Sequence, residues 1–308
     1  MTEQLARGGV FMEAELRSQP EVWRQAIAQS RVENTDQQRL LPADGARVAV
    51  IGCGTSWFMA QSYAVARESA GLGETDAFTA TEAFLDRGYD AVIALTRSGT
   101  TTEVLAVLEQ IKGQIPSTLI VGDVDSPAVQ LADSVVKLPF ADERSVVQTR
   151  FATTALSYLL SSLDIDLDEA IRDAESALAE EIPQELIAAE QFTFLGQGWT
   201  NGLAQEAALK MREAVQGWTE SYPAMEYRHG PISIAAPGRV TWMLGTPPVG
   251  LSEEVQRTGA SFIARAEHPL AELVLIHRVA LERARVRGLD PDSPRNLSRS
   301  VILDDQRS

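Results

Sequence analysis

The chain has 308 residues, of which 44% are hydrophobic and 23% charged, and its formal net charge is −16. This length and composition are typical of a globular protein with one large or two medium domains. The acidic charge argues against a general nucleic-acid-binding protein, because phosphate backbones require a basic surface. A small phosphorylated ligand is still compatible with it, since a few local hydrogen bonds can hold such a ligand.

The numbers of cysteines and histidines further restrict the classes of protein to which the chain can belong. One cysteine cannot form an internal disulfide, and the three histidines are too scattered in sequence to suggest a metal site. No stretch has the pattern of a signal peptide or of a membrane span. We therefore expect a cytoplasmic protein that binds no metal.

The first half of the chain predicts a helix followed by a parallel sheet. Residues 11–31 are expected to form a helix that buries Met12, Leu16, Val22, Trp23 and Ile27. Short apolar runs then indicate strands at residues 48–51, 91–95, 117–121 and 134–138. Most are separated by segments long enough for a helix, which is typical of βαβ units. A helix at 149–163 is expected to close this half.

The second half begins after an acidic segment. Residues 163–183 alternate acids with Leu, Ile and Ala, which favours a solvated amphipathic connector helix over an acidic binding tail. Strands are predicted at 191–195, 239–244 and 261–264, a helix at 271–287, and a turn-rich tail leading to an apolar run at 301–303. The predicted organisation is a helical lead-in at 1–35, a first subdomain at 36–163, the connector at 164–187 and a second subdomain at 188–308.

Two segments 144 positions apart each end an apolar strand in Gly-x-Gly and continue into a helix. In this alignment Gly52 matches Gly196, and Gly54 matches Gly198. A repeated strand–turn–helix unit predicts two similar α/β halves, each with a helix N-terminus able to hold an anion.

Two loops of the first half have the composition of a phosphate site. Thr55 and Ser56 follow the first glycine turn, where a helix N-cap and first turn are expected. The next strand is followed by residues 96–103, with five hydroxyl groups, one glycine and one arginine. In an open parallel sheet, ligands bind where strands end. The residues could serve only as helix caps, but two such loops on successive strands favour an anion site.

Other features of these loops are less specific. A dinucleotide site is disfavoured, because neither glycine turn completes G-x-G-x-x-G. Arg97 could pair with phosphate or contact a substrate hydroxyl, or it could be an ordinary surface arginine. Cys53 is better explained as a small buried thiol than as a nucleophile, since no histidine is near it in sequence.

The helix after the second glycine turn carries Glu206, Lys210 and Glu213 at helical spacing on one face. One carboxylate could move a proton beside a sugar carbonyl while the ammonium group orients it. The alternative is a common solvated charged face. Apolar residues cover the rest of this helix, so we expect it to be largely buried. His229 lies in a Gly-Pro turn and could be an acid–base group or a structural histidine.

Together these motifs resemble the SIS (sugar isomerase) family, in particular the isomerase half of glucosamine-6-phosphate synthase and its stand-alone deaminase and deglycase relatives. Five motifs occur in the family's order over nearly the whole chain: Gly52-Cys-Gly54-Thr55-Ser56, Arg97-Ser98-Gly99-Thr100-Thr101, Glu206-x-x-x-Lys210-x-x-Glu213, His229-Gly-Pro231 and Pro294-Arg-Asn-Leu-Ser-Arg299-Ser-Val.

The resemblance implies two flavodoxin-like SIS subdomains, no cofactor, and a homodimer whose active sites lie near the subunit boundary. It implies that the loop at 96–101 holds a sugar 6-phosphate and that Glu213 is the base, supported by Lys210 and Glu206. His229, reaching in from a partner subunit, would open the sugar ring. The implied substrate-binding residues are Gly52, Cys53, Gly54, Thr55, Ser56, Thr96, Arg97, Ser98, Gly99, Thr100, Thr101, Val146 and Arg299.

Three departures from the synthase pattern shape the expected activity. The sequence starts without the glutaminase domain, so glutamine-driven synthesis is not expected. The family's Ser-Gln-Ser is Thr96-Arg97-Ser98, and its acid after the glycine is Thr100. The tail lysine that meets the keto sugar is Arg299, which cannot readily lose a proton to form a Schiff base.

The sequence therefore predicts an isomerase, deaminase or deglycase acting on an amino- or keto-sugar 6-phosphate. One half would hold the substrate and the other would carry the chemistry, in one shared site. The alternatives are a non-catalytic sugar-phosphate sensor and, less favoured, a nucleotide-binding protein that NAD or ATP would stabilise.

Overall fold

A computed structural model describes residues 8–35 and 38–303 of the chain. Within these residues the chain forms two compact units. Unit 1 contains residues 8–21, 144–149 and 166–297, and unit 2 contains 22–35, 38–143, 150–165 and 298–303. The predicted subdomain boundaries stay a prediction, and the predicted start at residue 36 lies outside the described residues. No helix of the described chain is long and apolar enough to span a membrane.

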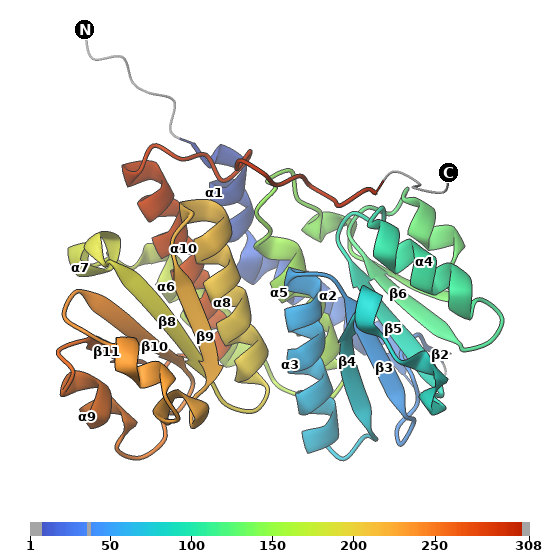
Figure 1. Ribbon diagram of the computed structural model, residues 1–308. Helices are drawn as coiled ribbons and strands as arrows, with labels where there is room; N and C mark the ends of the chain where they lie inside the picture. Colours follow the sequence, from blue (N-terminus) through green and yellow to red (C-terminus); the bar gives the residue numbers. More distant parts are fainter. Residues whose placement is uncertain (1–7, 36–37, 304–308) are drawn as a thin grey trace, which may run out of the picture. The chain divides into compact units, whose positions relative to one another are not determined.

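Unit 2 is built on a five-stranded, all-parallel sheet with the order β4-β3-β5-β6-β7 (Figure 1). Its strands are β3 (Val48–Gly52), β4 (Thr75–Thr79), β5 (Ala91–Thr96), β6 (Ser117–Val121) and β7 (Ser134–Lys137). Numbered within the unit, the order is 2-1-3-4-5, the flavodoxin-like arrangement. A small hairpin of β1 (Asn34–Thr35) and β2 (Gln38–Arg39) precedes the sheet.

Helices cover both faces of this sheet. On one face, Ala49, Val92 and Leu119 pack with Leu108 of α4 (Thr102–Ile111). Their sequence neighbours point to the opposite face, because strand side chains alternate. There α3 (Thr55–Ser69) packs on β3 and β4 and also on α5 (Arg150–Ser161), and α2 (Gln19–Glu33) is tied to α5 by a bond from Trp23 to Thr153.

Unit 1 repeats the same arrangement with one strand fewer, in the order β11-β10-β8-β9. Its strands are β8 (Gln191–Gly196), β9 (Thr219–Pro223), β10 (Arg239–Leu244) and β11 (Ser261–Ala264), all parallel. Its helices are α1 (Val10–Arg17), α6 (Asp168–Ala179), α7 (Gln184–Ala188), α8 (Thr200–Val215), α9 (Leu251–Gln256) and α10 (Pro269–Val286). Helix α8 packs on the sheet, and α10 packs on α8 and α6.

The duplication predicted from the glycine turns is confirmed by this topology. A Cβ atom on Gly52 would lie 2.7 Å from the carbonyl carbon of Ser56, and one on Gly196 would lie 2.5 Å from that of Thr200. In both units the first glycine therefore lets the first turn of the next helix approach its strand. The predicted fold class, two parallel α/β halves flanked by helices, is confirmed.

Several local predictions need correction. The predicted helix at 11–31 is two helices, α1 and α2, separated at Ser18, and Pro20 lies in the first turn of α2, where a missing N–H is tolerated. Its five predicted core residues are all buried. Strands β4 and β9 were missed, because each is a half-exposed edge strand rich in polar residues.

The acidic segment forms an amphipathic helix, as predicted. Helix α6 buries Ala170, Ile171 and Ala174 and leaves its acids toward solvent. It packs on α10 and so belongs to the core of unit 1.

Candidate functional site

The two predicted phosphate loops lie at neighbouring strand ends of unit 2. They follow β3 and β5, which pair in parallel and between which the strand order reverses. A reversal of this kind leaves a crevice at the carboxyl edge of a sheet, where ligands of α/β proteins bind. The sheet thus brings together residues that are some forty positions apart in sequence.

The turn after β3 presents the start of α3 at this edge. Gly54 adopts a left-handed φ of 53° and is the N-cap of α3, and no side chain caps the helix. Thr55 and Ser56 form the first turn and are 4% and 5% exposed. A helix N-terminus with its own hydroxyl groups is suited to an anion.

Cys53, between the two glycines, is half-buried. Burial raises the pKa of its thiol, which keeps the sulfur protonated at neutral pH. The structure therefore favours the interpretation of Cys53 as a packing residue over that of a nucleophile.

The loop after β5 is held in one conformation by its own hydroxyl groups. The Gly99 amide donates to Thr96 Oγ1 at 3.2 Å, and the Thr100 amide donates to Ser98 Oγ at 3.3 Å. Gly99 has a φ of 60°, and a Cβ atom there would overlap the Ser126 hydroxyl. Only glycine fits this position, so the loop is built for close approach of its backbone to a neighbour or a ligand.

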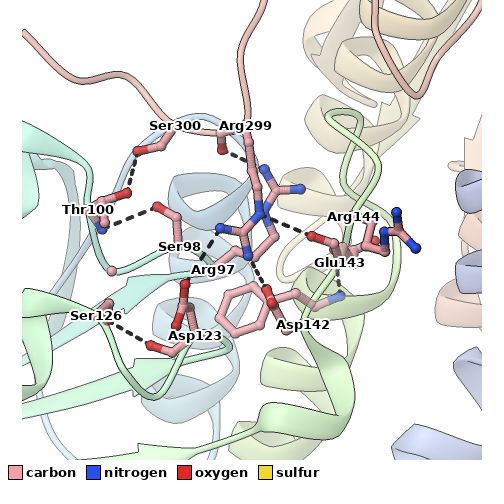
Figure 2. Close-up of polar contacts among 12 residues, drawn as sticks. Arg97, Ser98, Thr100, Asp123, Ser126, Asp142, Glu143, Arg144, Arg299 and Ser300 are labelled. Atoms are coloured by element: carbon pink, nitrogen blue, oxygen red, sulfur yellow. Dashed lines mark hydrogen bonds and ion pairs between the residues drawn. The ribbon is translucent and has the colours of Figure 1, made fainter.

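Arg97 is not the surface residue of the alternative interpretation, since it is 2% exposed. Its guanidinium donates to the carbonyl oxygen of Arg299 at 2.5 Å, as Figure 2 shows. The hydroxyl of Thr100 donates to Ser300 Oγ at 2.9 Å, and the Thr102 amide donates to the Val301 carbonyl at 3.2 Å. The C-terminal tail of the chain thus lies along the predicted phosphate loop (Figure 2).

Arg299 is bound by acidic residues that the sequence reasoning missed. Its guanidinium pairs with Asp142 Oδ1 at 2.6 Å and with Asp123 Oδ2 at 3.7 Å, and its Nε donates to the Glu143 carbonyl at 3.1 Å. Asp123 follows β6, the next parallel strand, so its position at the carboxyl edge of the sheet could have been predicted from the sequence. No local pattern marks Asp142.

Unit 1 contains the predicted catalytic helix, α8. Lys210 forms ion pairs with Glu206, at 3.4 Å, and with Glu213. The side chains of Glu206 and Lys210 have no exposed surface, whereas that of Glu213 is 20% exposed. The predicted single face is confirmed, and the alternative of a solvated charged face is wrong for Glu206 and Lys210.

Glu206, Lys210 and Glu213 form a charged triad. One ammonium group faces two carboxylates, so with all three ionised the cluster carries one net negative charge. Burial strengthens these interactions because water screens them less. Glu213 alone of the three can be reached from solvent, which makes it the member of the triad that can exchange a proton with a ligand.

The remaining predicted residues of unit 1 lie on irregular segments. His229 is exposed and ends a short 3₁₀ turn (Glu226–Arg228), its amide donating to the Glu226 carbonyl. Val146 is half-buried, and its amide donates to the Asp292 carbonyl at 3.3 Å. Among the described residues, no group of three His, Cys, Asp or Glu side chains could hold a metal ion.

Comparisons with known proteins identify relatives in sequence and in structure. No family model matches the chain. Glutamine–fructose-6-phosphate aminotransferase (isomerizing) of Sulfurisphaera tokodaii is 26% identical over 296 residues, covering 84% of this chain and 50% of that protein. The same enzyme of Gloeobacter violaceus is 26% identical over 358 residues, covering 96% and 59%. The chain spans about half the length of the curated relatives it matches.

Solved structures with the same fold include a glucosamine-6-phosphate deaminase of Thermotoga maritima, with a TM-score of 0.80, 22% identity and coverage of 94% of this chain and 99% of that one. Tagatose-6-phosphate ketose/aldose isomerase of Escherichia coli has a TM-score of 0.78, 19% identity and coverage of 97% and 98%. The predicted resemblance to the SIS family of phosphosugar isomerases is thereby confirmed, and the chain has the two-subdomain fold of these proteins.

Proposed function

We propose that this chain, which resembles the SIS phosphosugar isomerases in sequence and fold, is an enzyme that transfers a proton between C1 and C2 of an amino- or keto-sugar 6-phosphate. The observation that carries the proposal is the cluster on α8, in which a buried lysine separates two carboxylates and only Glu213 is accessible. Such a cluster is difficult to explain as a stabilising device, because buried ion pairs contribute little net stability.

Unit 2 would bind the phosphate. The N-terminus of α3 with Thr55 and Ser56, together with the loop at 96–101, offers backbone amides and hydroxyl groups at the strand-order reversal. Arg97 lies in this loop and would add a positive charge close to the phosphate. The tail at 299–303, which runs along the loop, would help to enclose the ligand.

Glu213 would act as the base. It would remove the proton from C2 of an aldose phosphate, so that the C–H electron pair forms the C1–C2 double bond while the C1 carbonyl π pair moves to its oxygen, which takes up a proton to give an enediol. A proton would then be returned at C1 as the hydroxyl on C2 loses its proton and becomes the carbonyl. Lys210 would stabilise the carboxylate and orient it, and Glu206 would hold the ammonium group in place. Where C2 carries nitrogen, the product is a C2 imine, and water would release ammonia from it to leave the ketose phosphate. Where C1 carries nitrogen, as in a fructosamine phosphate, the proton would move from C1 to C2, and water would release the amine from the resulting C1 imine to leave the aldose phosphate.

His229 would protonate the ring oxygen and open the sugar, since an imidazole can serve as a general acid in catalysis. As in the family pattern, we propose that it acts within a homodimer, reaching the site of the other subunit. Arg299 would not form a covalent intermediate with the substrate, because a guanidinium does not replace a lysine amine in Schiff-base formation and is here already bound by Asp142.

The proposal is tested with purified protein and a panel of substrates. Glucosamine 6-phosphate and a fructosamine 6-phosphate are assayed for release of ammonia or amine, and glucose 6-phosphate and fructose 6-phosphate for interconversion. The variant E213Q should lose at least about a hundredfold in kcat, the usual contribution of a general base. The matched control is E253Q, a change of the same kind at an exposed glutamate of α9.

Two outcomes would contradict the proposed function. Turnover that is equal in wild type and E213Q would remove the assigned base. Binding of sugar phosphates without turnover of any of them would favour the sensor over the enzyme.

A further inference from the structure

Unit 1 contains a cavity that the proposed reaction does not use. Its volume is about 520 Å³, within the range of about 300–1,000 Å³ typical of small-molecule sites. It lies where β8 and β10 end, at the strand-order reversal of the unit-1 sheet. The lining residues that matter for its chemistry are Glu169, Trp199, Thr200, Arg265, Glu267 and His268.

The cavity is separate from the predicted base. Trp199 immediately precedes α8, and Glu213 lies near the other end of that helix. Fourteen residues of helix correspond to about 20 Å. A ligand in the cavity would therefore not touch Glu213.

The glycine turn that lines the cavity shares a positive-φ second glycine with the glycine turn of unit 2, but its helix begins one position later and its hydroxyl group is already bonded. Gly198 has a left-handed φ of 58°, like its counterpart in unit 2. Thr200, which matches Ser56 in the repeat, accepts from the Gln197 amide at 2.9 Å and donates to the Leu244 carbonyl at 2.9 Å. This turn therefore offers an incoming anion fewer donors than its counterpart.

The charges around the cavity also disfavour an anion. Arg265 is bound by Glu180 at 2.6 Å, by Glu267 at 3.0 Å and by Glu272 at 2.8 Å. Burial lowers the pKa of His268 to about 4, so its ring is neutral at physiological pH. Glu169 adds a further carboxylate at the exposed rim. Among the residues that line the cavity, two carboxylates, those of Glu169 and Glu267, face one cation, Arg265, so the cavity attracts positive charge.

An aromatic side chain completes the lining. Trp199 is half-buried, and its ring lies 5.8 Å from the imidazole of His268. The face of an indole attracts ammonium groups, and sites for such ligands combine aromatic rings with nearby carboxylates. We infer that the unit-1 cavity is a binding site for a small organic ammonium ion, held by the Trp199 face and the Glu169 carboxylate.

The inference is tested by NMR of the tryptophan indole N–H signals of the full chain, titrated with choline. The matched ligand is 3,3-dimethylbutanol, which has the same shape without the charge, and sodium chloride keeps the ionic strength constant. We expect a saturable shift of the Trp199 signal by choline and at least about tenfold weaker binding of the neutral analogue. Inorganic phosphate should not shift the Trp199 signal.

Variants distinguish choline binding in the cavity from binding elsewhere on the surface. Binding to the variants is measured by isothermal titration calorimetry, because W199L lacks the indole that reports binding by NMR. W199L should abolish choline binding, whereas W218L, which removes an exposed tryptophan outside the cavity, should leave it unchanged. E169Q changes only a rim residue that is not part of the core and should weaken choline binding several-fold. Equal binding of choline and its neutral analogue, unchanged binding in both W199L and E169Q, or no saturable shift with choline would each overturn the inference.

Discussion

Replacing His277 by glutamine is expected to make the chain more resistant to acid. His277 lies on α10 with no exposed surface, and Gln19 Nε2 is 3.4 Å from its Nδ1. Burial, together with the nearby charge of Lys210, lowers the pKa of His277 to about 3. The folded chain therefore keeps this imidazole neutral over a pH range in which the unfolded chain protonates it.

The size of the effect follows from proton linkage. The folded pKa lies below the unfolded value of about 6.5, so the unfolded state binds more protons and stability falls as the pH is lowered through this range. Each pH unit below 6.5 corresponds to about 1.4 kcal/mol until the folded pKa is reached. From pH 7.5 to pH 5, His277 should thus remove about 2 kcal/mol from the free energy of unfolding.

The assay is urea-induced unfolding of wild type and H277Q at pH 7.5 and pH 5. The loss of unfolding free energy between the two pH values should be about 2 kcal/mol smaller in H277Q than in wild type. A pH-independent effect of the substitution on stability cancels in this difference. H229Q is the matched control, because it removes an exposed histidine of the same unit. If H277Q and wild type lose the same stability on acidification, the argument from burial is refuted.

Three further experiments test the local structure. K210M should reduce the free energy of unfolding by about 3–5 kcal/mol, because it leaves the fully buried carboxylate of Glu206 without the Lys210 cation; a free energy of unfolding within about 1 kcal/mol of wild type would contradict this. G99A should lower the melting temperature, and adding S126G should recover part of the loss, because it removes the side chain that the new Cβ would overlap. R299A and D142A should each speed hydrogen exchange in the C-terminal tail, and wild-type exchange rates would show that this ion pair does not anchor it.

The features of the fold that could be predicted are those that local sterics or periodicity enforce. Buried strands such as β3 are continuous apolar runs, and Gly52 and Gly196 stand where no side chain fits. The edge strands β4 and β9 could not be predicted in this way. An edge strand of a parallel sheet is half-exposed, so its residues are mixed and its pattern resembles that of a loop.

Within the candidate site, ion pairs between residues of one helix could be predicted from their spacing. Ion pairs between residues far apart in the sequence could not. The ion pairs of Lys210 follow from the i,i+3 and i,i+4 geometry of α8. The pair between Arg299 and Asp142 joins residues 157 positions apart, with no local pattern to mark it. The sequence therefore indicated which residues carry charge near the loops, while their partners depend on tertiary packing.

The two glycine turns show why a shared turn geometry does not determine which ligand binds. Gly52 and Gly196 are both fixed by contact with the next helix, and Gly54 and Gly198 share a left-handed φ. The residue after the second glycine differs between the two turns, because Trp199 stands where unit 2 has Thr55. The charge and hydroxyl groups around a glycine turn must be examined before an anion is assigned to it, and in unit 1 they indicate a cation.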